Sequence, residues 1–346
     1  MLHNCPDPSR KAVRIILQPS FLILCLILAA VQAQAANKYA LLVGIAGYAG
    51  PNALDGPVND VNKMRQLLIG RLGFPADNIT VLRDGQATRQ AILNALDDLR
   101  RTARAGDVAL FYYAGHGTVW PDLFSVRQDE ATPLSVPANS LLPGILHPGA
   151  SRKRQVFLGF KNKNQPEISS PTLWDSALCP FDHAGDDSGK PWGNLILDDE
   201  LNDKFAGFKD IYFTFIADAC NSGSSARGFS KTRSIPYKEA VGRRAVNNPP
   251  PAPLGQGPAL GPRFAALTAA RDEQLAYEIE DDDKQSCGLF SKWLRKELAA
   301  SGGNGSYQDL LNAVRKGVGK GQEPQLMVFQ EDTRHSPFLW PGRASR

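Results

Sequence analysis

Short apolar runs alternate with helix-patterned segments along the first third of the chain. The runs end at glycine, aspartate or histidine, as buried parallel strands followed by loops do, and they lie at 39–45, 78–84 and 107–117. The segments 58–74 and 87–107 carry apolar residues at helical spacing, and Thr88 is the expected N-cap of the second helix. This alternation predicts an open α/β layer built on parallel strands.

Residues 118–195 break the pattern, because they are rich in proline, glycine and asparagine and have little periodicity. A stretch of this length predicts a long loop insertion. A second irregular stretch, 231–262, has the composition of a linker, with basic residues ahead of "NNPPPAPLGQGP". The ordered segments around these two are a helix at 194–208, strands at 210–220 and 263–270, and helices at 288–301 and 307–318. We expect one domain over 36–346 that carries two loop insertions.

The first 35 residues have the pattern of a signal peptide. A basic stretch precedes an apolar run at 21–31, and "AQA" at 33–35 matches a cleavage signal. The alternative is a membrane anchor, but the run is about half of the roughly 20 apolar residues that a spanning helix needs. We therefore expect cleavage after residue 35, no stable membrane anchor afterwards, and export to the periplasm or beyond.

Composition and charge narrow the class of protein. The chain has 346 residues, of which 42% are hydrophobic and 21% charged, so it is globular rather than disordered. The formal net charge is +4, and removal of residues 1–35 takes away three basic side chains and one acidic side chain, which leaves +2. So small a charge gives no electrostatic case for a nucleic-acid partner.

Cysteine is scarce after the signal peptide, where only Cys179, Cys220 and Cys287 remain. Three cysteines in an oxidising compartment form at most one disulfide and are no framework. If Cys179 pairs with Cys287, the thiol left over is Cys220, but the sequence leaves that pairing open. A thiol kept reduced outside the cytoplasm is explained more easily by chemistry than by packing.

Two predicted strand ends carry reactive side chains, His116 in "AGHG" and Cys220 in "DAC". The carboxyl ends of parallel strands meet at one edge of an open α/β sheet, so we expect both residues on the same rim. A histidine there can take the proton of the thiol and return it to a leaving amine. The backbone amides of Gly117 and Cys220 are the candidate oxyanion donors. The alternatives are a buried structural cysteine and an ordinary core histidine.

Together, "YYAGHG" and "DACNSGS" resemble the catalytic histidine and cysteine boxes of caspase-like cysteine peptidases, the metacaspase branch in particular. Supporting segments match in the same order: "YALLVGI", "LDGPVNDVNKM", "LCPFDHAGDD", "LILDDELND", "FAALTAARDEQLAYE" and "GLFSKWL". The resemblance implies a caspase-like, open, mostly parallel β-sheet flanked by helices on both faces, with long loop insertions. It also implies peptidase activity.

The sequence departs from the caspase pattern in ways that favour metacaspases. The caspase signature has Gln two positions before the cysteine and the histidine about 50 residues upstream. Here Asp218 takes the Gln position, and His116 lies 104 residues before Cys220. Ala114 and Pro57 stand where relatives often have Ser and Cys.

The resemblance also implies cleavage after Arg or Lys, because metacaspases line the first substrate pocket with two aspartates. The matching positions here are Asp218 and Asp60. A carboxylate pair in a partly dry pocket selects a cation and rejects an acidic side chain. The alternative for Asp60 is an acid at a helix N-terminus, where the helix dipole favours it.

Calcium is a possible cofactor by the same resemblance, through a pair of acids matching Asp198 and Asp199. Hard oxygen ligands are what calcium needs, but Arg227 stands near the place of a further expected acid. We interpret Asp198 and Asp199 as caps of the helix that follows, and leave calcium dependence open. No other cofactor is expected.

The expected function is that of an exported cysteine endopeptidase, with a Cys220–His116 dyad that cleaves protein or peptide substrates after basic residues. Basic residues at 231–244 suggest self-processing there, although the same run fits a solvated loop. The alternatives are a caspase-fold binding or regulatory module with an inert thiol, and an acyl transferase that uses the same dyad. The sequence predicts no oligomeric state.

Overall fold

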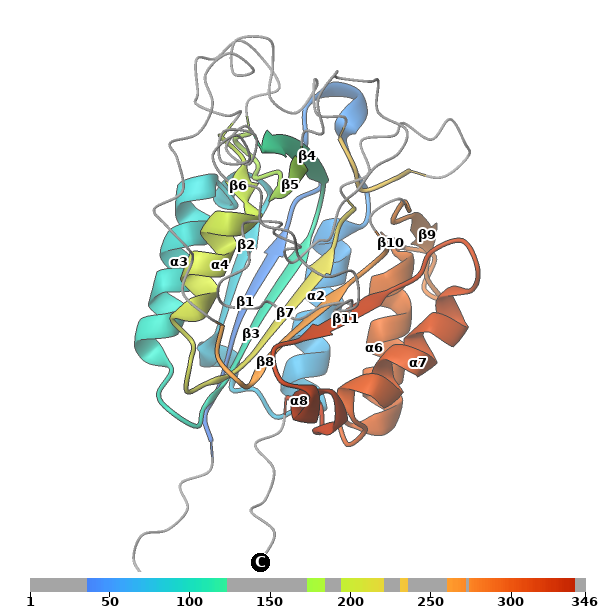
Figure 1. Ribbon diagram of the computed structural model, residues 1–346. Helices are drawn as coiled ribbons and strands as arrows, with labels where there is room; N and C mark the ends of the chain where they lie inside the picture. The colour runs from blue at the N-terminus through green and yellow to red at the C-terminus, as the bar shows by residue number, and fades with distance from the viewer. Residues whose placement is uncertain are drawn as a thin grey trace, which may run out of the picture. The chain divides into compact units, whose positions relative to one another are not determined.

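The computed structural model describes residues 36–122, 173–183, 194–220, 231–235, 260–271 and 274–339 (Figure 1). Residues 37–346 form one compact unit. The predicted signal peptide, most of the 118–195 insertion and most of the 231–262 linker lie outside the described residues. No helix in the described part is long and apolar enough to cross a membrane.

A six-stranded sheet forms the centre of the unit, in the order β11-β8-β7-β3-β1-β2. Its strands are β1 (Lys38–Gly44), β2 (Ile79–Arg83), β3 (Val108–Ala114), β7 (Tyr212–Asp218), β8 (Phe264–Thr268) and β11 (Gln325–Val328). All neighbours pair in parallel except β11, which runs antiparallel to β8 at the edge. The predicted open, mostly parallel sheet is confirmed. The edge strand β11 was not predicted.

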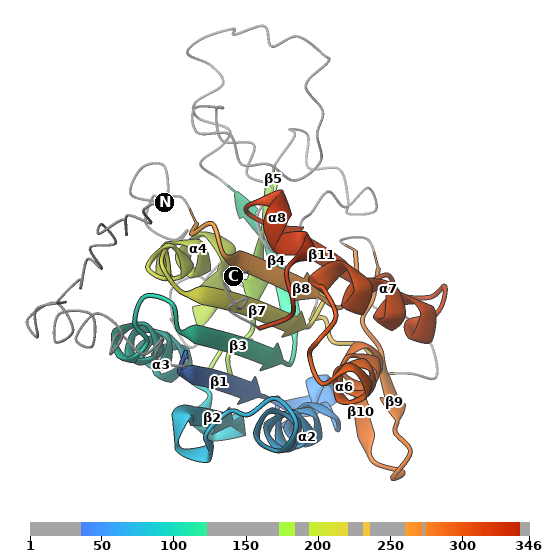
Figure 2. The same cartoon turned by 90° about the horizontal axis from the view of Figure 1, so that it is seen from below.

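Helices cover both faces of this sheet, with α3 and α4 on one face and α2, α6 and α7 on the other (Figure 2). The α-helices are α2 (Pro57–Gly70), α3 (Arg89–Thr102), α4 (Asp198–Ala206), α6 (Leu289–Ser301), α7 (Tyr307–Val318) and α8 (Glu331–His335). Short 3-10 helices lie at Gly50–Asn52, Ala76–Asn78 and Asp84–Gln86. Thr88 caps α3 as predicted, because its Oγ1 accepts a hydrogen bond from Ala91 N at 3.2 Å.

Each face of the sheet buries its own hydrophobic cluster. Leu96 and Leu99 of α3 pack with Phe205 of α4 on one face, and Leu68 of α2 packs with Leu294 of α6 on the other. The strands between them are apolar on both sides, and all seven residues of β3 are buried. Because the central strands are buried on both faces, their sequences are continuous apolar runs rather than alternating patterns.

Two small sheets stand at the carboxyl end of the central strands. One has the order β4-β5-β6 and comprises β4 (Gly117–Asp122), β5 (Leu173–Leu178) and β6 (Ile196–Leu197). The other is the antiparallel pair β9 (Glu278–Glu280) and β10 (Ser286–Gly288). The ends of the 118–195 segment therefore contain strands, although the sequence predicted a loop throughout. The six-residue strands β4 (GTVWPD) and β5 (LWDSAL) do not alternate apolar and polar residues, and β4 contains Pro121, so no period of two marks them in the sequence.

Candidate active site

The ends of β3 and β7 bring His116 and Cys220 to one edge of the sheet. Ala114 pairs with Asp218 in the parallel register, so each reactive residue lies two positions past a paired residue. The two strand ends stay in contact beyond that pair, where Gly115 N donates to Asp218 O at 3.4 Å. Both side chains are buried, with exposures of 2% for His116 and 3% for Cys220.

The imidazole of His116 is oriented by a main-chain carbonyl. Its Nε2 lies 2.7 Å from Asn52 O. A carbonyl oxygen can only accept, so Nε2 carries the hydrogen and Nδ1 keeps its lone pair. Nδ1 is buried and has no hydrogen-bond partner within the described residues. Burial is the main cause that lowers the pKa of His116 to about 3, so the ring is neutral at pH 7 and can act as a base through Nδ1.

Two tyrosines fix the backbone around His116. The hydroxyl of Tyr48 accepts from His116 N at 2.9 Å and donates to Cys179 O at 2.9 Å, and its ring centroid lies 4.5 Å from the imidazole centroid. The hydroxyl of Tyr113 lies 2.9 Å from His116 O. A Cβ on Gly115 would lie 2.6 Å from the Tyr48 oxygen, so this position must be glycine. Neither Asn52 nor Tyr48 was predicted, because carbonyl and hydroxyl supports leave no motif in a sequence.

The two predicted oxyanion donors point at one oxygen. Gly117 N and Cys220 N each donate to the carbonyl oxygen of Arg233, both at 3.1 Å. A pair of amides aimed at a single carbonyl is the arrangement that stabilises an oxyanion during acyl transfer. The carbonyl held there belongs to a segment of the same chain.

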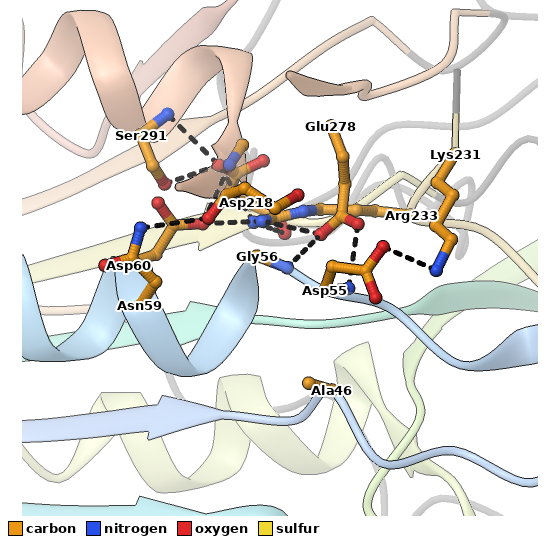
Figure 3. A network of polar contacts seen from close by, with 12 residues as sticks. Ala46, Asp55, Gly56, Asn59, Asp60, Asp218, Lys231, Arg233, Glu278 and Ser291 are labelled. Carbon is orange, nitrogen blue, oxygen red and sulfur yellow. Dashed lines mark hydrogen bonds and ion pairs between the residues drawn. The ribbon is translucent and has the colours of Figure 1, made fainter. Parts of the chain in front are cut away.

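The side chain of Arg233 fills an acidic pocket beside these amides (Figure 3). Its Nη2 lies 2.5 Å from Asp60 Oδ2 and 3.2 Å from Glu278 Oε1, and its Nη1 lies 3.0 Å from Asp218 Oδ2. Arg233, Asp60 and Asp218 are fully buried. The pocket thus brings together the two predicted aspartates, and adds Glu278, which the sequence analysis missed.

The carboxylates are held in place by groups around the pocket. Asp60 Oδ1 accepts from Arg295 Nη1 at 2.6 Å, and Asp218 Oδ2 accepts from Ser291 N at 3.1 Å. Glu278 accepts from Gly56 N at 2.9 Å and from the neighbouring Asp55 N at 3.0 Å. The helix-terminus alternative for Asp60 is also met, since it lies in the first turn of α2.

The charge of the pocket favours a cation. Three carboxylates face one permanent guanidinium, that of Arg295, before Arg233 is counted. Burial raises the pKa of Asp218, Arg233 opposes that shift and Asp60 adds to it. Burial alone would lower the pKa of Arg233, but Asp218 and Asp60 outweigh it and raise that pKa well above its usual value. Because these buried side chains carry a net negative charge without Arg233, the free energy of the pocket is lowest when a cation occupies it.

The backbone from Lys231 to Ile235 crosses the site through two isolated bridges, at Thr232 and Ser234, with a bend at Arg233 between them. On one side, Arg233 N donates to Ala276 O at 3.0 Å and Glu278 N donates to Lys231 O at 2.9 Å. On the other side, Ile235 N donates to Gly117 O at 3.0 Å. This is strand addition, the mode in which clefts commonly bind extended peptides.

The expected capping role of Asp198 is wrong. Helix α4 begins at Asp198 itself, so the N-cap position is taken by Leu197, whose side chain makes no capping hydrogen bond. Asp198 is buried and its Oδ2 accepts from Ser176 N at 3.3 Å on β5, so it links the helix start to that strand. The side chain of Asp199 lies outside the described part.

The described residues contain no group of three or more His, Cys, Asp or Glu side chains placed to hold a metal ion. One oxygen of Asp198 already accepts from a backbone amide, and calcium would need several free oxygens beside it. The described side chains alone therefore do not make a calcium site. Calcium dependence through Asp198 and Asp199 stays a prediction.

The three cysteines of the unit are not joined by a disulfide. Burial raises the pKa of the Cys179 thiol far above its usual value. Burial is also the main cause that raises the pKa of the Cys287 thiol to about 11. Cys179 and Cys287 are therefore protonated at neutral pH and poor nucleophiles. Cys220 alone of the three adjoins the paired amides and the imidazole-bearing strand end.

Comparison with known proteins agrees with the fold. The family described as "Caspase domain" matches residues 37–147 and 153–334. The match includes both strand ends, the one that carries His116 and the one that carries Cys220. The chain belongs to the caspase-domain family of peptidases.

Curated relatives of the chain are metacaspases. Metacaspase-6 of Arabidopsis thaliana is 46% identical over 193 residues, which cover 54% of this chain and 38% of that protein. Metacaspase-1B of Aspergillus oryzae is 26% identical over 307 residues, 84% of this chain and 67% of that protein. Metacaspase-1 of Candida albicans is 44% identical over 87 residues, and the match spans only 19% of its length.

A solved structure shares the fold. It is the crystal structure of a protein from Geobacter sulfurreducens, which is 18% identical to this chain with a TM-score of 0.57. The superposition covers 87% of this chain and 97% of that one. At this identity the likeness supports the fold alone.

Proposed function

We propose that the protein is a cysteine endopeptidase that cleaves after arginine. Cys220 is the nucleophile, His116 the general base and acid, and the amides of Gly117 and Cys220 the oxyanion donors. The observation that carries the proposal is Arg233, whose side chain pairs with Asp60, Asp218 and Glu278 while its carbonyl accepts from both amides. In a bound substrate, the residue before the scissile bond has its side chain in the specificity pocket and its carbonyl oxygen at the oxyanion donors, as Arg233 does here.

The reaction has two steps in this proposal. His116 Nδ1 takes the proton of the Cys220 thiol, and Sγ bonds to the carbonyl carbon of the substrate arginine. The C–N bond to the next residue then breaks, and the leaving amine takes the proton from Nδ1. Water gives a proton to the same nitrogen and its oxygen bonds to the thioester carbon. The C–S bond then breaks, the sulfur takes the proton back from Nδ1, and the new carboxylic acid leaves and ionises in solvent. The hydrogen bond from Nε2 to Asn52 O keeps Nδ1 as the working nitrogen throughout.

The pocket favours arginine over lysine in this proposal. Two guanidinium nitrogens of Arg233 contact three different carboxylates. A planar guanidinium can bind on two sides at once, whereas an ammonium is a single point charge on a stem of different length. We therefore narrow the sequence expectation of Arg or Lys to arginine first and lysine second.

The described segment also gives the self-processing proposal a specific bond, Arg233–Ser234. Segment 231–235 lies in the cleft as a substrate would, and Arg233 is within the predicted 231–244 region. While the bond is intact, the segment fills the place of any other substrate. We propose that cleavage after Arg233 precedes cleavage of other polypeptides.

Hydrolysis of a peptide with a single arginine, by protein that has been incubated beforehand, tests the activity. Wild type should cleave on the carboxyl side of the arginine, while Cys220→Ala and His116→Ala should lose turnover by at least about a thousandfold. A peptide with glutamate in place of arginine is the matched substrate control. Turnover that persists in Cys220→Ala would remove the proposed nucleophile.

Iodoacetamide separates this proposal from the binding-module alternative. An activated thiolate alkylates rapidly near neutral pH, whereas an inert buried thiol does not. A binding module needs only the acidic pocket for the arginine side chain. The two amides that point at the carbonyl of Arg233 have a use in peptide-bond cleavage and none in binding alone. Export of the enzyme, which rests on residues 1–35, stays part of the proposal.

A further inference from the structure

The segment in the cleft continues past Arg233 along strand β4. Ser234 forms a parallel bridge with Gly117, and Ile235 N donates to Gly117 O at 3.0 Å. Gly117 N donates in turn to Arg233 O at 3.1 Å. One glycine thus binds the segment on both sides of the Arg233–Ser234 peptide bond.

Strand β4 is placed to receive such a chain. It is an edge strand of the β4-β5-β6 sheet, and its inner edge pairs with β5 from Gly117↔Leu178 onward. The outer edge at Gly117 carries the segment, which therefore extends this sheet by strand addition. The residues before the scissile bond use a different edge, since Thr232 bridges Tyr277 next to β9.

The side chain of Ile235 is buried. Its exposure is 0%, and it belongs to the hydrophobic cluster that contains Ala177 and Leu178 of β5. Ser234, one position earlier, is only partly buried. The second position after the scissile bond therefore faces the apolar cluster, whereas the arginine before that bond faces the acidic pocket.

We propose that the cleft has a binding site for an aliphatic side chain at the second position after the cleaved bond. The inference rests on the proposed function, because it treats residues 231–235 as an image of a substrate. The substrate class is then a polypeptide with arginine, any residue of moderate size, and isoleucine, valine or leucine in succession. An aliphatic side chain gains free energy when it is buried in this cluster. A carboxylate there would be buried without a partner charge, so acidic side chains are disfavoured at this position.

Cleavage of synthetic peptides by the full-length protein, incubated beforehand, tests this site without altering the fold. The parent peptide is Ser-Lys-Thr-Arg-Ser-Ile-Pro-Tyr, the sequence of residues 230–237. Variants replace Ile by Val, Leu, Gly or Asp, and a control variant replaces the first residue of the peptide, Ser, by Ala. Relative to the parent, kcat/KM should change less than about threefold for Val, Leu and the control, and fall at least about tenfold for Gly. The fall should be about a hundredfold for Asp.

The outcomes separate the two proposals. Cleavage after arginine at equal rates in all peptides would overturn the aliphatic site and leave the arginine peptidase intact. Cleavage of none of the peptides would overturn the proposed function and the site with it. A rate order of Ile, Val and Leu above Gly and Gly above Asp supports the site.

Discussion

The guanidinium of Arg233 lies 2.5 Å from the carboxylate of Asp60, although 173 residues separate them along the chain. Asp60 is held on its other oxygen by Arg295 at 2.6 Å, and both acid and arginine are shielded from water. A buried pair of this kind is stable only while both partners are present. The pocket is therefore complete when an arginine, from this chain or from a substrate, occupies it.

Glu278 should set the preference for arginine. In Glu278→Gln, an NH2 group can face the guanidinium where a carboxylate oxygen now accepts at 3.2 Å. Loss of one charge-assisted hydrogen bond should lower kcat/KM for arginine peptides about tenfold or more. Lysine peptides should lose less, so the ratio of the two rates is the readout. Glu280→Gln, at an exposed position on the same strand, is the control and should leave the ratio unchanged.

Gly288→Ala should close the pocket. A Cβ at this position would lie 2.0 Å from Asp218 Oδ2 and 2.7 Å from Arg233 Nη1. Activity on arginine peptides should fall by at least about a hundredfold, since a 1 Å displacement of a bound group can cost that much. Gly321→Ala is the control, because nothing lies within 4 Å of a Cβ there. Equal activity of the two variants would show that the pocket is elsewhere.

Tyr48→Phe should weaken the support of His116. The change removes the acceptor of His116 N and leaves that buried amide unpaired, at a cost of about 1–3 kcal/mol in unfolding free energy. A denaturant titration measures the loss. We also expect kcat to fall while KM changes little, because the pocket is untouched. Tyr39→Phe, on a partly exposed residue of β1, is the control.

The buried imidazole should make stability depend on pH. The pKa of His116 is lowered by burial from 6.5 to about 3, so between these values the unfolded chain binds the proton more tightly than the folded one. Stability from this group is present above pH 6.5 and is lost as the pH falls, by about 1.4 kcal/mol per unit. Unfolding free energies at pH 6.5 and 4.5 should therefore fall more for wild type than for His116→Asn. Parallel losses in the two proteins would contradict the assignment.

Much of the fold was predictable because its central strands are buried on both faces. Apolar runs ending at His116 and Cys220 identified β3 and β7, and the rule for parallel strand ends predicted a shared rim, which the Ala114–Asp218 register confirms. Short strands such as β6, with two residues, gave no periodic signal.

The site was predictable only where a side chain carries the chemistry. Asp60 and Asp218 were found through family resemblance. Glu278 is the last residue of the matching segment "FAALTAARDEQLAYE", but it was given no role because nothing in that segment marks one acid as a pocket residue. The carbonyl of Asn52 could not be found, because every residue has one. Arg233 was seen as one basic residue among several in a linker, since only folding brings it 3.0 Å from Asp218.

The most direct test of the account is the mass and N-terminal sequence of the fragments formed when the purified protein is incubated. Wild type should yield a fragment that begins at Ser234, and Cys220→Ala should stay intact. Arg233→Ala should lose this cut and Arg233→Lys should slow it, while Lys231→Ala, at an exposed position, should keep it. A wild-type protein that stays whole and inactive, or a cut after Arg233 that survives in Cys220→Ala, would contradict it.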